Sequence, residues 1–131
     1  MKFTENDKRN VTWVAAFAVL SWLGEFVHNQ IELPGLTFFS PENSLTALVT
    51  VTLVLLWLFL PSGKIFGMVL LALGLLHLIG GAMISVIPFK FLPFYPEQSV
   101  THYLSHILYG FAQLPLIIMM IVAIWRKPRI R

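Results

Sequence analysis

The chain has 131 residues, of which 57% are hydrophobic and only 11% are charged. A soluble domain carries about 25% charged residues, so this composition excludes an ordinary soluble protein and favours one that is embedded in a membrane. The net charge of +3 does not indicate nucleic acid binding, because the basic residues lie where membrane topology places them. The absence of cysteine excludes disulfides and thiolate metal ligands.

Four long apolar segments follow one another along the chain, at about residues 11–33, 43–60, 64–87 and 98–125. Each is about long enough to cross the roughly 30 Å of hydrocarbon in a bilayer as a helix. The sequence therefore predicts an all-α integral membrane protein with a four-helix transmembrane bundle. One membrane domain is expected over residues 1–131.

The basic residues predict how these spans are oriented. Lys90 follows the third span, whereas every other lysine and arginine falls on the opposite side of the membrane. The positive-inside rule then places both termini in the cytoplasm and the connections 34–42 and 88–97 outside, in a multi-pass protein of the cell membrane. Three tryptophans are expected near the cytoplasmic interface: Trp13, Trp57 and Trp125.

Two nearly identical motifs open the second and fourth spans: FSPENSLT at 39–46 and FYPEQSVT at 94–101. Pro41 and Pro96 are predicted at the first helical position, where the missing N–H of proline costs nothing, with a glutamate beside each in the first turn. Ser40 is expected to cap the earlier helix. If the motif reflects duplication, the chain is two tandem helical hairpins related by a pseudo-twofold axis along the membrane normal.

Glycines recur every seven residues on the third span, and such a stripe of small residues predicts close helix packing. The glycines are Gly67, Gly74 and Gly81.

Ionisable side chains within the spans are the candidates for function, because a charge at the centre of a membrane helix costs about 2.5–3.5 kcal/mol on insertion scales. Those of the first span share one helical face: Glu25, His28 and Glu32. The third span contributes one histidine and the fourth a polar stripe: His77, His102, His106, Tyr109 and Gln113.

Helical rise predicts that some of these side chains meet. At about 1.5 Å per residue, Glu25, His77 and His106 fall at a similar depth, just outside the middle of the membrane. His28 and His102 lie about one turn further out, and Glu32 is expected at the interface. We therefore expect a polar pocket in the outer half of the bilayer.

The side chains expected in this pocket suit a transition metal. Glu25-x-x-His28 has the spacing of carboxylate-bridged metal bundles, and His102-x-x-x-His106 places two imidazoles on one helical face, as in zinc and iron sites. The candidate metal ligands are Glu25, His28, His77, His102 and His106. This set suits Zn, Fe, Cu or Mn better than Mg or Ca, which prefer oxygen ligands. A haem held by His77 with His102 or His106 fits the same residues.

Three functions of different classes remain open. The first, which we favour, is a metal- or haem-centred membrane enzyme or redox protein acting on a lipid-soluble substrate, with Glu25, His28 and Tyr109 as candidate catalytic residues. The second is a small proton-coupled carrier that uses Glu25. The third is an accessory subunit of a larger membrane complex, in which polar residues only join helices. The expected partners are membrane lipids and a lipid-soluble small molecule, without nucleic acid; a homodimer or a larger complex is compatible with each function.

Overall fold

The computed structural model describes residues 5–60, 62–91, 93 and 95–125. Within these residues the chain is helical and contains no strand. The elements are α1 (Glu5–Glu32), α2 (Pro41–Phe59), α3 (Gly63–Leu76), the π-helical segment η1 (His77–Ile84), which continues α3 directly, and α4 (Val100–Trp125).

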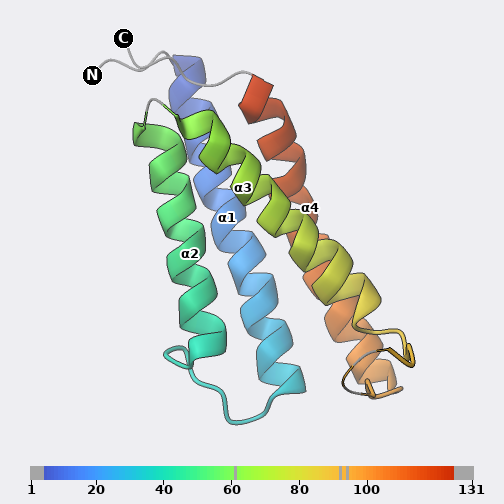
Figure 1. The fold of residues 1–131 in the computed structure, drawn as a ribbon. Coiled ribbons are helices and arrows are strands. Elements are labelled where there is room, and N and C mark those ends of the chain that lie inside the picture. Colours follow the sequence, from blue (N-terminus) through green and yellow to red (C-terminus); the bar gives the residue numbers. More distant parts are fainter. Residues whose placement is uncertain (1–4, 61, 92, 94, 126–131) are drawn as a thin grey trace.

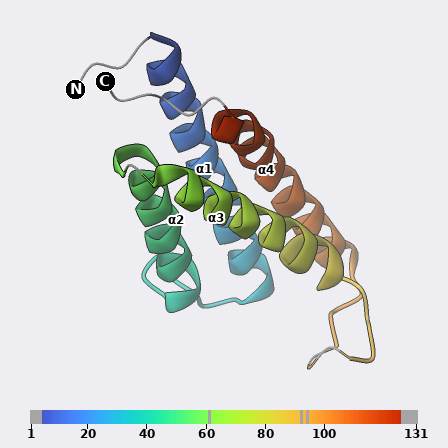
Figure 2. The ribbon, with the colours of Figure 1, turned by 45° about the horizontal axis from the view of Figure 1, so that its top comes forward.

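The helices run up and down in one bundle (Figure 1). The start of α1, the end of α4 and the short α2–α3 connection lie at one end, which we call the terminal end; there the ammonium of Lys64 lies 5.2 Å from the ring centroid of Trp125. The connections that follow α1 and η1 lie at the other end, which we call the two-loop end. The α3–η1 stretch crosses the bundle obliquely, beginning beside α2 and ending beside α4 (Figure 2).

Four helical stretches are long and apolar enough to cross a membrane: Arg9–Glu32, Pro41–Phe59, Gly63–Ile84 and Val100–Trp125. The prediction of an all-α chain with four long apolar helices is thus confirmed for the described residues. Large apolar side chains on the outside of the bundle, such as Leu48, Leu76 and Phe111, are more than half exposed. Such a surface suits lipid and indicates a multi-pass membrane protein.

The apolar core occupies the half of the bundle toward the terminal end. There Val14 of α1, Trp57 of α2, Leu70 of α3 and Met120 of α4 are almost fully buried against one another. The side chain of Trp57 is only 1% exposed and packs in this core, so its indole faces the other helices, and its position near the cytoplasmic interface stays a prediction. Buried polar side chains, among them Asn43, His102 and His106, lie in the half toward the two-loop end.

The first motif starts its helix largely as predicted. Pro41 is the first residue of α2, and Glu42 lies in its first turn, where the positive end of the helix dipole favours a carboxylate. Ser40 occupies the N-cap position, but its side chain does not cap the helix. Its hydroxyl turns back instead and accepts the N–H of Thr37 at 2.8 Å.

The second motif starts its helix later than predicted. Helix α4 begins at Val100, so Pro96 lies before the helix and not at its first position. The physical reason is the serine that follows: the hydroxyl of Ser99 accepts the N–H of His102 at 3.2 Å and caps the helix there. The two motifs therefore differ in local structure, and the pseudo-twofold relation stays a prediction.

The glycines of the third span lie at close helix contacts. A Cβ at Gly67 would lie 2.7 Å from Trp57 Cδ1, and a Cβ at Gly81 would lie 2.9 Å from Tyr109 Cε1. At Gly74 the nearest atom, at 3.1 Å, belongs to Ile117. The stripe thus allows α3 and η1 to approach α2 and α4, as small residues do between membrane helices.

We expect Gly24→Ala to destabilise the bundle. Helix α1 packs most extensively against α4, and a Cβ at Gly24 would lie 2.3 Å from the Cβ of Ala112, so the helices must move apart. Overpacking of this kind costs about 1–3 kcal/mol of unfolding free energy, which denaturant titration in detergent micelles measures. Gly80→Ala is the control, because its nearest neighbour would be a flexible side-chain atom at 3.5 Å. Equal stability of the two variants would contradict the close α1–α4 approach.

Candidate metal centre

Three potential metal ligands meet between α1 and α4. The Nε2 atoms of His28 and His106 lie 3.1 Å apart. One ligand atom each from His28, Glu32 and His106 lies within 4.8 Å of the other two. We call these three residues the ligand cluster. His28 and Glu32 share one face of α1, because residues four apart lie one turn above each other.

Two buried side chains of α4 hold the Glu32 carboxylate. The Nδ1 atom of His102 lies 2.6 Å from Glu32 Oε2, and the hydroxyl of Ser105 donates to Oε1 at 2.5 Å. His102 is 6% exposed and Ser105 is 2% exposed, whereas Glu32 is half-buried, so these contacts are partly shielded from solvent. Glu32 therefore has one fixed position, although the sequence placed it only at the interface.

The π-helical segment orients His106. With its i+5 spacing, the N–H of Ser85 bonds the carbonyl of Gly80 at 3.1 Å, and the carbonyl of Gly81 accepts from the Ser85 hydroxyl and from the His106 ring. His106 Nδ1 lies 2.9 Å from that oxygen. A carbonyl oxygen only accepts hydrogen bonds, so Nδ1 carries the hydrogen and Nε2 of the neutral ring presents a lone pair.

A chain of amides orients His28 in the same way. The side-chain NH₂ of Asn43 donates to the backbone carbonyl of Thr37 at 2.8 Å, which fixes the orientation of that amide. Asn43 Oδ1 then accepts from the NH₂ of Asn29 at 2.9 Å. Asn29 Oδ1 is therefore the atom 3.3 Å from His28 Nδ1, so this nitrogen carries the hydrogen and Nε2 of the neutral ring presents a lone pair.

Two nitrogens that both carry lone pairs thus lie 3.1 Å apart, in rings that meet edge to face with their centroids 4.4 Å apart. Two hydrogen-bond acceptors at this distance repel each other. A proton or a metal ion bound between them removes this repulsion. Two nitrogens bound to one tetrahedral zinc at 2.0–2.1 Å are about 3.3 Å apart. The observed distance between the two nitrogens is close to that value, and the two rings, whose centroids are 4.4 Å apart, would turn and move apart to direct both lone pairs at one ion.

A second group of polar side chains lies next to the ligand cluster. His77 Nδ1 is 3.7 Å from Glu25 Oε2, and the carboxylate atom is buried without a hydrogen-bond partner. The Tyr109 ring connects the two groups, with its centroid 5.0 Å from that of His28 and 6.2 Å from that of His77. Glu25 therefore pairs with His77 and is not part of the ligand cluster.

The predicted ligands divide between these groups. His28 and His106 belong to the ligand cluster, and Glu25 and His77 form the neighbouring pair. His102 positions Glu32 through Nδ1, while its Nε2 is buried without a hydrogen-bond partner. Its ring centroid lies 4.4 Å from that of His106. The unpartnered nitrogen of His102 thus lies in a ring that packs on the cluster.

Several residues of the site were missed at the level of sequence. The role of Glu32 had a signal, because it stands four residues after His28 on the same helical face. No sequence signal indicated the carbonyl of Gly81, because every residue has a backbone carbonyl and the π-helical spacing at this position was not predicted. Asn43 lies in the first motif, and at the level of sequence it was interpreted only as part of the start of a helix.

Comparison of the chain with protein-family models, with curated proteins and with solved structures gives no match.

Proposed function

We propose that this protein is a membrane metalloprotein whose metal is held by His28, Glu32 and His106. The observation that carries the proposal is the close approach of the two Nε2 atoms, 3.1 Å apart, beside a carboxylate. Two imidazoles and one carboxylate are the three protein ligands of several catalytic zinc sites, in which the fourth position is left for water or substrate. The proposed centre therefore binds and activates an exogenous molecule, in line with an enzyme or redox role.

The atoms around the ligand cluster support a metal site. Ligating histidines almost always donate their other N–H to a carbonyl or carboxylate, and this partner fixes the ring orientation. Here Gly81 accepts from His106 and Asn29 from His28, while Ser105 donates to Glu32. Each ligand thus has an outer partner from the chain.

The donor set suits Zn, Fe, Cu or Mn, because nitrogen and carboxylate ligands are mixed. A haem is less well supported by the same atoms. The haem expected from the sequence uses His77 with His102 or His106, and His77 lies outside the ligand cluster, with its Nδ1 3.7 Å from Glu25 Oε2.

We propose that the two-loop end faces the outside of the cell membrane, since the positive-inside rule places both termini in the cytoplasm. His106 follows the start of α4 by about 9 Å of helical rise, so the metal would lie within the outer half of the bilayer. A metal at this depth is accessible to lipid-soluble molecules from the side.

Metal titration tests the proposal. Protein purified in mild detergent and stripped with a chelator is titrated with Zn²⁺ and, in parallel, with Co²⁺. We expect one ion per chain with a dissociation constant of about 1 μM or tighter, equivalent to about −8 kcal/mol, and Co²⁺ absorption bands typical of nitrogen and oxygen ligands. Binding no tighter than that of a detergent-solubilised membrane protein without histidines would overturn the proposal.

A small proton-coupled carrier is a second candidate, favoured by the buried, unpartnered Oε2 of Glu25. An ionisable group inside a membrane protein is a functional candidate by default. This function requires Glu25 and not the ligand cluster, so proton-driven uptake that survives His106→Ala but is lost in Glu25→Gln would favour it.

A further inference from the structure

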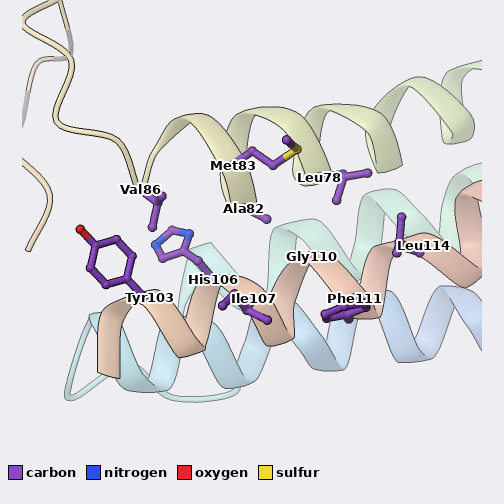
Figure 3. A pocket seen from close by; sticks show the side chains of 10 residues that line it. All are labelled: Leu78, Ala82, Met83, Val86, Tyr103, His106, Ile107, Gly110, Phe111 and Leu114. Carbon is purple, nitrogen blue, oxygen red and sulfur yellow. The ribbon is translucent and has the colours of Figure 1, made fainter. Parts of the chain in front are cut away.

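A groove runs along the side of the bundle between η1 and α4 (Figure 3). Its volume is about 280 Å³, slightly below the range of about 300–1,000 Å³ that is common for small-molecule sites. Leu78 and Leu114 line the end toward the middle of the bundle, whereas Tyr103 and His106 line the end toward the two loops. One end of the groove is therefore apolar and the other carries polar side chains.

The length and polarity of the groove match one lipid chain. From Tyr103 to Leu114, α4 rises about 16 Å, close to the thickness of one leaflet, which is half of the roughly 30 Å hydrocarbon layer. The polar end lies toward the membrane surface and the apolar end toward its centre, the same direction as in a lipid. The sides are open, since Met83 and Ile107 are more than half exposed.

Small residues let the two helices approach at the groove. A Cβ at Gly110 would lie 3.3 Å from the Cβ of Ala82, so η1 and α4 are in close contact here. This close contact keeps the groove narrow. Both residues line the groove. A narrow channel of this volume suits one linear hydrocarbon chain better than a branched or ring-shaped molecule.

The groove also reaches one of the proposed metal ligands. His106 lines the groove and is at the same time a member of the ligand cluster. A molecule whose chain occupies the groove would therefore hold its polar head beside the side chain that ligates the metal.

We propose that the groove binds the tail of a single-chain amphiphile, a linear acyl chain with an oxygen-bearing head, and delivers this head to the open position of the metal. This inference rests on the proposed function and names its class of substrate. The chain supplies binding energy by burying apolar surface, and the metal supplies recognition of the oxygen.

A photoreactive fatty acid tests the proposal. A diazirine-bearing palmitic acid is added to zinc-loaded protein in lipid nanodiscs, and the labelled peptides are identified by mass spectrometry. We expect saturable labelling of η1 and α4 beside the groove, reduced about tenfold by excess unlabelled palmitate. The groove between α1 and α2 is an internal control: it holds about 240 Å³, and no ionisable side chain lines it. Equal, unsaturable labelling of both grooves would mean that bulk lipid alone occupies them and would overturn the proposal.

Substitutions separate this inference from the proposed function. Met83→Trp and Ile107→Trp are expected to fill the groove and to lower labelling about tenfold without changing zinc content, because both side chains are partly exposed and lie outside the ligand cluster. Leu108→Trp is the matched control, equally exposed on α4 but outside the groove. Removal of zinc should weaken labelling about tenfold. Saturable labelling that does not depend on zinc would overturn the delivery of the head to the metal, whereas absence of zinc binding would overturn the proposed function itself.

Discussion

His106→Ala is expected to weaken metal binding more than about 100-fold. Loss of an outer partner of a metal ligand already costs about 10–100-fold in affinity, and this substitution removes a ligand itself. His28→Ala should have a similar effect, because it leaves the same one nitrogen and one carboxylate in the ligand cluster. Competition with a chromophoric chelator measures the dissociation constants of the wild type and of both variants in detergent.

His77→Ala is the matched histidine control. His77 lies beside the ligand cluster but pairs with Glu25, so its loss should change metal affinity less than about threefold. Loss of binding in His77→Ala with retention in His106→Ala would move the metal to the Glu25–His77 pair and contradict the ligand set proposed above.

The number and type of the helices could be predicted from the sequence because hydropathy and length are properties of segments. Four apolar stretches separated by proline- and charge-containing gaps leave few alternatives to four helices. Helix starts were less predictable, because they depend on single hydrogen bonds. Pro41 and Pro96 have similar neighbours, yet only the first begins a helix, since the hydroxyl of Ser99 accepts the N–H of His102 and starts the fourth helix after its proline.

The candidate site could be predicted in outline only. Depth along straight helices brought together side chains from α1, η1 and α4, but it did not determine which of them touch. Glu25 and His77 meet each other, whereas His28 and His106 meet beside Glu32. This division depends on helix rotation, and the π-helical segment changes the rotation of the third span just where His77 stands. Sequence periodicity at 3.6 residues per turn cannot anticipate such a change.

The close approach of the two Nε2 atoms also predicts an unusual response of stability to metal. In the wild type, metal at 100 times its dissociation constant should raise the free energy of unfolding by about 2.7 kcal/mol. His28→Gln should abolish this increase, because an amide replaces a ligand. Without metal, however, the variant should be more stable than the wild type by about 0.5–1.5 kcal/mol, since the glutamine NH₂ can donate to the His106 lone pair that otherwise faces another acceptor.

Denaturant titration in micelles, with and without chelator, measures both effects. Ser21→Ala is the control: it removes another buried hydrogen bond between α1 and α4, from the Ser21 hydroxyl to the side-chain oxygen of Gln113. Loss of this hydrogen bond should lower the free energy of unfolding by about 1 kcal/mol with or without metal. Metal should still raise the free energy of unfolding of this variant as it does in the wild type. If the polar residues only joined helices, His28→Gln would behave like this control and destabilise the protein in both conditions. A gain in stability without metal, together with loss of the response to metal, is the result expected if both Nε2 atoms lack a hydrogen in the metal-free protein and both bind the metal.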